Sequence, residues 1–124
     1  GAHDGPNHDA ESVAAAARAL EEHVMPPRVM VACSHGNSRK DHVRQVATAA
    51  EVAGQVAAGS DRILGVMVES NLVAGRQDLV PGQDLTYGQS ITDACMGWDD
   101  TVTTLEGFAR AVRTRRGSRR GESA

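Results

Sequence analysis

Three side chains of types that commonly bind metals stand out in this sequence, and two of them follow apolar stretches. His35 comes just after the run 29–33, and Glu69 directly follows the run 63–68. A third candidate, Asp93, comes after a polar loop. If the two runs are successive strands of a parallel α/β barrel, His35 and Glu69 face one common mouth, where catalytic groups gather. Because His, Glu and Asp together suit a divalent cation of borderline hardness, they are predicted to form a metal site.

Each of these residues also has a simpler interpretation. His35 could be an ordinary loop or helix-capping residue, Glu69 could reach solvent at the end of its strand, and Asp93 could cap a short helical turn. The residue types alone leave both interpretations open. Cys33 is interpreted as a small buried hydrophobe and not as a ligand, since two residues of strand separate it from His35 by about 6.5 Å.

The other cysteine, histidine and tryptophan side chains show no spacing typical of a site. Cys95 and Trp98 are expected to pack beneath the last helix. The remaining histidines are expected at the surface, at positions 3, 8, 23 and 42. With two cysteines in all, the chain has too few for a disulfide framework, so reduced thiols are expected.

The composition narrows the class of protein. The chain has 124 residues, with 13 Lys and Arg against 16 Asp and Glu and a formal net charge of −3. This balance argues against a dedicated binder of nucleic acid or anionic membranes. No apolar run has the length of a membrane span and no secretory signal pattern is visible, so a cytoplasmic protein without membrane association is expected.

Hydrophobic periodicity predicts an α-β-α-β-loop-α order. Helices are expected at 10–23, 40–58 and 100–117, strands at 29–33 and 63–68, and a long polar loop at 70–89. Asp9, Asn37 or Ser38, and Asp99 or Asp100 are the expected helix caps. The strand-helix-strand portion is typical of a βαβ unit with parallel strands, each covered on both faces. Two such strands cannot close a barrel, so the sheet is expected to be incomplete.

Three segments closely resemble the carboxyl-terminal part of type I DAHP synthases (3-deoxy-D-arabino-heptulosonate 7-phosphate synthases). They read Val-Met-Val-Ala-Cys-Ser-His-Gly-Asn-Ser-Arg-Lys at 29–40, Gly-Val-Met-Val-Glu-Ser-Asn-Leu at 65–72 and Tyr-Gly-Gln-Ser-Ile-Thr-Asp-Ala-Cys-Met-Gly-Trp at 87–98. Their length, order and spacing make the resemblance specific, and it extends over residues 5–117.

The resemblance implies a fold, a reaction and a cofactor. The family is a (β/α)8 TIM barrel that condenses phosphoenolpyruvate with erythrose 4-phosphate to DAHP and phosphate, the first step of the shikimate pathway to aromatic amino acids. It requires a divalent metal, here Mn²⁺, Fe²⁺, Co²⁺ or Zn²⁺. The family's ligands fall on His35, Glu69 and Asp93, of which His35 and Asp93 also count as catalytic. Residues 1–117 would be the C-terminal portion of such a barrel, and residues 118–124 a disordered basic tail.

The chain also departs from the family pattern. The family's Cys ligand and most of its phosphoenolpyruvate-binding Arg and Lys residues lie upstream of the region covered. Ala32 stands where an Asp is usual, and Arg39 where a small residue is common. The resemblance therefore implies a truncated or split DAHP synthase, inactive alone, that forms homo-oligomers or pairs with the missing barrel portion. The alternative is a non-catalytic metal-binding or regulatory half-barrel module that pairs with a complete synthase.

Overall fold

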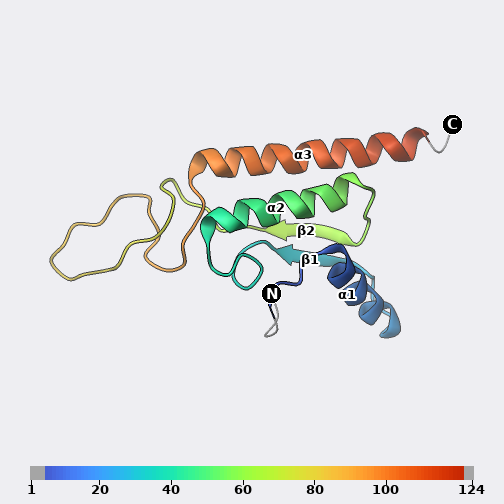
Figure 1. Cartoon of the computed structure of the whole chain (residues 1–124), viewed down its shortest axis with the longest axis horizontal. Coiled ribbons are helices and arrows are strands. Elements are labelled where there is room, and N and C mark those ends of the chain that lie inside the picture. Colours follow the sequence, from blue (N-terminus) through green and yellow to red (C-terminus); the bar gives the residue numbers. More distant parts are fainter. Residues whose placement is uncertain (1–4, 122–124) are drawn as a thin grey trace.

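The computed structural model describes residues 5–121, which form three helices and two strands (Figure 1). Along the chain these are α1 (Ala10–Glu22), β1 (Val29–Ala32), α2 (His42–Ala57), β2 (Ile63–Met67) and α3 (Trp98–Gly121). The predicted order of elements is confirmed, and both strands lie within one residue of their predicted limits.

The two strands form a parallel sheet. Val31 of β1 pairs with Val66 of β2, and Ala32 pairs with Met67, after an irregularity in the register between Val29 and Met30. The predicted βαβ unit is therefore confirmed. Since both strands point the same way, the residues that follow them begin at the same edge of the sheet, which is the edge from which the segment 68–97 extends (Figure 1).

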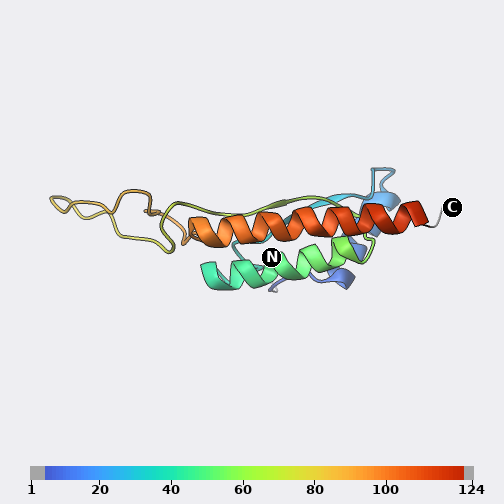
Figure 2. The ribbon, with the colours of Figure 1, turned by 90° about the horizontal axis from the view of Figure 1, so that it is seen from above.

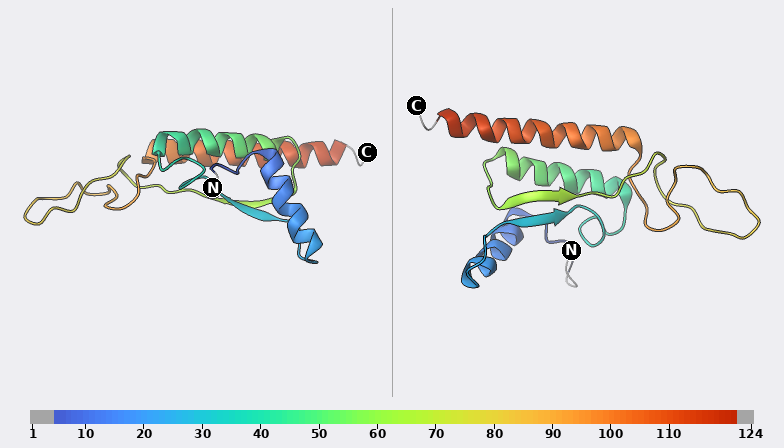
Figure 3. Two further views of the ribbon diagram at one scale, coloured as in Figure 1. Left: turned by 60° about the horizontal axis from the view of Figure 1, so that its bottom comes forward. Right: turned by 180° about the vertical axis from the view of Figure 1, so that it is seen from behind.

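The hydrophobic core lies on one face of this sheet. All three helices contribute to it, with α2 providing the largest share, and α3 runs alongside α2 (Figure 2). Both of these helices lie on the same side of the strands (Figure 3). The buried core residues are Val13, Val31, Cys33, Ala49, Val52, Val56, Ile63 and Ala111.

The opposite face of the sheet is open. Met30 of β1 is 66% exposed and Leu64 of β2 is 68% exposed. The prediction that both faces of the strands are covered is therefore wrong for residues 5–121, because the helices of this part of the chain pack on one face only. These residues form a two-stranded sheet and not a closed TIM barrel.

Helix α2 begins later than predicted. Its N-cap is Asp41, whose side chain accepts hydrogen bonds from the backbone N–H groups of Val43 and Arg44. Asn37 and Ser38, the predicted caps, instead lie in a preceding turn. Arg39 and Lys40 both have left-handed backbone dihedrals, with φ of 53° and 60°, and residues in that conformation cannot start a right-handed helix.

Helix α3 continues past Gly117 to Gly121. Residues 118–121, predicted as part of a disordered tail, are therefore helical, and residues 122–124 lie outside the described part of the chain. The expected caps Asp99 and Asp100 lie in the first turn of the helix. None of the helices described here is both long and apolar enough to cross a membrane.

Two expectations about aromatic residues are corrected. Trp98 is 56% exposed at the start of α3 and does not pack beneath that helix, whereas Cys95 is half-buried.

His8 is not a free surface residue, because its side chain is mostly buried and its Nε2 atom lies 2.8 Å from a carboxylate oxygen of Glu51. His23 is exposed, as predicted, and His42 is half-buried. His3 lies outside the described residues.

The segment 68–97 is long and has little regular structure, but it is paired with itself. Isolated bridges join Ser70 to Met96, Gly75 to Cys95 and Arg76 to Ser90. These bridges return the chain to the edge of the sheet just before α3 begins.

Candidate metal centre

The turn after β1 carries His35. This residue has a left-handed backbone, with φ of 53°, and its carbonyl oxygen accepts a hydrogen bond of 2.8 Å from the N–H of Lys40. Asn37 closes the turn from the other side by donating its side-chain amide to the carbonyl oxygen of Ala32, at 2.7 Å. The hydroxyl of Ser34 lies 2.9 Å from Nδ1 of the His35 ring. This contact holds Nδ1 and leaves Nε2 facing the other candidate ligands.

Glu69 follows β2 by two residues. Its backbone is held by hydrogen bonds, one of which runs from the N–H of Met96 to the Glu69 carbonyl oxygen, at 3.0 Å. The side chain is 24% exposed, the lowest exposure of the three candidate ligands. The strand end therefore presents the carboxylate from a fixed point of the backbone.

Asp93 comes from the returning part of the segment 68–97. The residue before it, Thr92, accepts a hydrogen bond of 2.8 Å from Nε of Arg76, and the bridge between Gly75 and Cys95 follows it. The Cys95 thiol in turn donates to the Asp93 carbonyl oxygen, at 3.5 Å. Asp93 therefore reaches the sheet edge through pairing inside this segment and not through a strand of its own.

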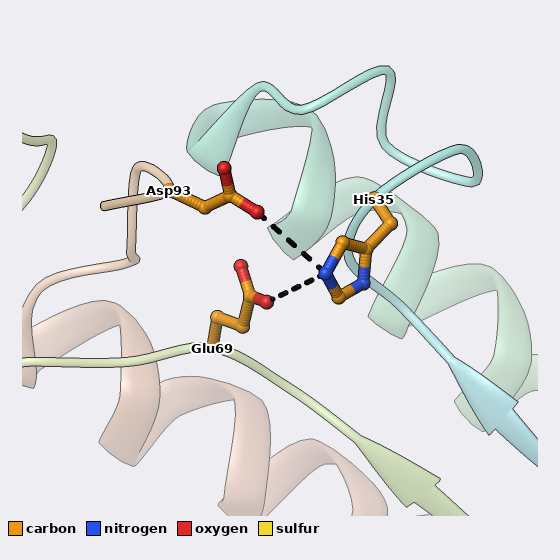
Figure 4. A group of neighbouring side chains, drawn as sticks. All are labelled: His35, Glu69 and Asp93. Carbon is orange, nitrogen blue, oxygen red and sulfur yellow. Dashed lines mark ion pairs between the residues drawn. The ribbon is translucent and has the colours of Figure 1, made fainter.

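The three side chains converge on one point (Figure 4). Nε2 of His35 lies 3.1 Å from Oε1 of Glu69 and 3.6 Å from Oδ2 of Asp93. One ligand atom from each residue can be chosen so that all lie within 4.8 Å of one another. Atoms that bind one ion at about 2.1 Å are separated by roughly 3–4 Å, so small side-chain adjustments would let all three reach the same ion.

The chemistry of this cluster also fits a divalent cation. Two carboxylates placed around one imidazole repel each other, and a cation between them would remove that repulsion. One nitrogen and two oxygen donors suit metals of borderline hardness better than a purely hard or a purely soft ion. The residues His35, Glu69 and Asp93, which the sequence singled out, are therefore brought together by the fold as predicted.

The residues next to the candidate ligands differ in burial and in what they contribute to the site. Cys33 is fully buried, and burial raises the pKa of its thiol to about 11, so it is the predicted buried hydrophobe. Burial is also the main cause that raises the pKa of the Cys95 thiol, and the nearby carboxylates of Glu69 and Asp93 add to the effect. Ala32 contributes only its backbone carbonyl, and Arg39 is exposed.

Comparison with known proteins identifies the family. Residues 1–106 match the DAHP synthetase I family. The chain belongs to this family. A tyrosine-inhibited phospho-2-dehydro-3-deoxyheptonate aldolase of Schizosaccharomyces pombe is 48% identical over 120 residues, which is 94% of this chain and 32% of that relative. The Phe-sensitive enzyme of the same name from Escherichia coli K12 is 47% identical over 112 residues, or 90% of this chain and 32% of that enzyme.

A solved structure of a DAHP synthetase I relative has the same fold over this region. The phospho-2-dehydro-3-deoxyheptonate aldolase of Francisella tularensis superimposes with a TM-score of 0.88 at 45% identity, covering 93% of this chain and 33% of that protein. The family resemblance seen in the three sequence segments is confirmed. The chain spans about a third of the length of the relatives it matches.

Two residues at the site were not singled out by the sequence. Ser34 contacts the His35 ring, and Gln45 of α2 contacts the backbone of Glu69. Ser34 is adjacent to a candidate ligand in the sequence, and this position could have indicated a role at the site. The role of Gln45 could not have been found in this way, because a glutamine in a helix gives no indication of a partner at the end of a distant strand.

Proposed function

We propose that this chain supplies the metal-binding part of a DAHP synthase active site. The reaction would be that of the family, condensation of phosphoenolpyruvate with erythrose 4-phosphate to give DAHP and phosphate. The observation that carries the proposal is the convergence of His35, Glu69 and Asp93 at one edge of the sheet, in a chain of this family. The metal would be Mn²⁺, Fe²⁺, Co²⁺ or Zn²⁺, all of which accept this donor set.

The three residues would contribute differently to binding of the ion. When bound, the cation supplies Lewis-acid chemistry, which polarises an aldehyde oxygen toward attack by a carbon nucleophile. Glu69 and Asp93 provide the negative charge that balances the cation. His35 would keep its proton on Nδ1, next to the Ser34 hydroxyl, and offer the lone pair of Nε2.

The exposures suggest which of these residues meet the substrate. The side chains of His35 and Asp93 are 48% and 45% exposed, while that of Glu69 is 24% exposed. A substrate approaching from solvent would therefore meet His35 and Asp93 first. We assign these two residues to the catalytic set and regard Glu69 mainly as a metal ligand.

The substrates carry phosphate groups that Arg and Lys side chains must bind in a fixed geometry. Since the chain spans about a third of its relatives, we propose that most of these groups, and the strands that would complete a TIM barrel, come from outside this third. They would cover the open face of the sheet around Met30 and Leu64. A cytoplasmic location and an oligomeric assembly remain predictions.

The open sheet face also supports a second candidate function. A non-catalytic metal-binding or regulatory half-barrel would use the same face to pair with a complete synthase. The two functions differ in whether the metal cluster of this chain takes part in turnover.

A complementation assay would distinguish them. The chain would be mixed with the Escherichia coli Phe-sensitive enzyme from which the matching third has been deleted, and loss of phosphoenolpyruvate would be followed with erythrose 4-phosphate and Mn²⁺. We expect turnover only in the mixture, and none when the chain carries Glu69→Gln. An inactive mixture, together with Mn²⁺ binding by the chain, would support the regulatory alternative instead.

A further inference from the structure

Gln45 has an unusual position for a polar residue. It lies in the first turns of α2 and is 1% exposed, which makes it one of the most buried side chains of the described residues. Buried amides are found where both their donor and their acceptor have partners. Here both partners belong to a single residue, Glu69, which is one of the candidate metal ligands.

The two hydrogen bonds form a bracket around the Glu69 backbone. The N–H of Glu69 donates to Oε1 of Gln45 at 2.6 Å, and Nε2 of Gln45 donates to the carbonyl oxygen of Glu69 at 3.0 Å. One donor and one acceptor side by side are what a neighbouring strand would offer. The amide of Gln45 therefore continues the strand pairing for a residue that lies two positions beyond the end of β2.

This bracket is connected to the segment that carries Asp93. The carbonyl oxygen of Glu69 accepts a second hydrogen bond from the N–H of Met96, at 3.0 Å, and Met96 is fully buried. The N–H of Asn71 donates back to the carbonyl oxygen of Met96, also at 3.0 Å. A shift of the Glu69 backbone would therefore also disturb the chain close to Asp93.

The same helix face is connected to the turn that carries His35. Thr48, three residues after Gln45 on α2, is buried and donates its hydroxyl to the carbonyl oxygen of Asn37, at 3.3 Å. Residues three apart on a helix lie on the same face, so Gln45 and Thr48 point toward the same edge of the sheet. Helix α2 thus makes side-chain hydrogen bonds to the segments of two ligands.

We propose that Gln45 is a positioning residue of the metal centre, which sets the place of the Glu69 carboxylate by holding both polar groups of the Glu69 backbone. This inference rests on the proposed metal site. Residues that orient metal ligands typically change metal affinity by about 10–100-fold when they are replaced. Loss of the bracket should therefore weaken metal binding by a comparable factor while the helices persist.

The test is a titration of the full chain with CoCl₂, because Co²⁺ reports both affinity and coordination geometry through its visible absorption. In Gln45→Met, which keeps the length of the side chain and removes both hydrogen bonds, we expect the Co²⁺ dissociation constant to rise about 10–100-fold and the absorption bands to shift. Far-UV circular dichroism would confirm that the helices are retained.

Gln55→Met is the matched control. Gln55 lies on the same helix and donates its amide to a backbone carbonyl oxygen, that of His8, at 2.7 Å, so this hydrogen bond involves none of the three candidate ligands. We expect unchanged Co²⁺ affinity and bands in this variant. If Gln45→Met lost its helical signal, Gln45→Asn would be tested in its place. This variant keeps an amide but has a side chain one methylene shorter, so we expect the same rise in the Co²⁺ dissociation constant and the same shift of the absorption bands.

The outcomes separate the inference from the function on which it rests. Unchanged Co²⁺ affinity and bands in a folded Gln45 variant, or an equal loss in Gln55→Met, would overturn the role of Gln45 and leave the metal site in place. Failure of the unmodified chain to bind Co²⁺ would overturn the metal site and the inference together.

Discussion

Nε2 of His35 lies 3.1 Å from Oε1 of Glu69, although the two residues follow different strands. The parallel arrangement of β1 and β2 makes this contact possible, because both strands end at the same edge of the sheet. Each residue is then fixed by its own surroundings, His35 by Ser34 and Glu69 by Gln45. The pair is therefore a product of the fold and not of a local sequence motif.

The hydrophobic core between α2 and the sheet should contribute strongly to the free energy of unfolding. Val52 is fully buried in this core, so Val52→Ala would remove two methyl groups and leave a cavity, at a cost of roughly 1.5–3 kcal/mol in the free energy of unfolding. Val43→Ala on the same helix is the control, since Val43 is 66% exposed. Urea unfolding of both variants would measure the difference, and equal losses would contradict the described packing.

The N-cap of α2 should make stability depend on acid pH. Hydrogen bonds from the N–H groups of Val43 and then Arg44 lower the pKa of Asp41 below its ordinary value of 3.8. A carboxyl group with a lowered folded-state pKa stabilises the fold above its unfolded pKa, and this stabilisation is lost as the pH falls through the folded pKa. The Asp41 contribution should thus be present at neutral pH and disappear in acid.

Asp41→Asn tests this contribution, because asparagine can cap a helix but does not titrate. Thermal unfolding followed between about pH 6 and pH 2 should show a smaller loss of stability in acid for this variant than for the unmodified chain. Asp84→Asn, at an exposed position in the segment 68–97, serves as the control. The same acid dependence in Asp41→Asn as in the unmodified chain would show that this cap does not carry the effect.

The two thiols should react at different rates. Cys33 is fully buried and its pKa is raised to about 11, so at pH 8 only about one thiol in a thousand is ionised. Cys95 is half-buried and more accessible. A thiol reagent such as DTNB should modify one cysteine in the folded chain and both after denaturation, and Cys95→Ser should abolish the first reaction. Rapid modification of both thiols in the folded chain would contradict the burial of Cys33.

Gly88 should not tolerate a side chain. Its φ is +77°, and an added Cβ would lie 2.8 Å from Cβ of Leu72. Gly88→Ala therefore combines an unfavourable backbone with a clash, and we expect a loss of about 1–2 kcal/mol or more in stability. Gly82→Ala has a similar φ of +81° without any neighbour within 4 Å, so a comparison of the two thermal unfolding curves isolates the clash. Equal destabilisation would show that the contact with Leu72 relaxes freely.

The helices and strands were predictable where apolar residues recur regularly, as in the run 63–68 and along α2. The start of α2 was predicted two residues too early, because three non-glycine residues in the turn after β1 have positive φ, and no sequence pattern predicts this. They are His35, Arg39 and Lys40. The end of α3 was missed because one glycine in a helix costs only about 1 kcal/mol. A tertiary contact also anchors this helix, since Arg115 donates to the carbonyl oxygen of Ser60 at 2.7 Å.

The candidate site was predictable to a different extent. His35 and Glu69 follow recognisable strands, so their types and places were informative. Asp93 was a candidate by its residue type, but only the family resemblance favoured it over a simple cap, because its approach to the other two residues depends on pairing within an irregular segment. The role of Gln45 could not be predicted, since its two hydrogen bonds join a helix to a residue far along the chain.

The proposed metal centre is tested by the binding of Mn²⁺ to the purified chain, followed by electron paramagnetic resonance. We predict that the unmodified chain binds one Mn²⁺ and that Glu69→Gln weakens binding by at least the roughly 10–100-fold typical of changes around a metal site. Glu51→Gln is the matched control, because Glu51 forms a 2.8 Å pair with His8 and is not part of the cluster, and this variant should bind Mn²⁺ normally. Equal Mn²⁺ binding by Glu69→Gln and the unmodified chain would contradict the proposed metal centre.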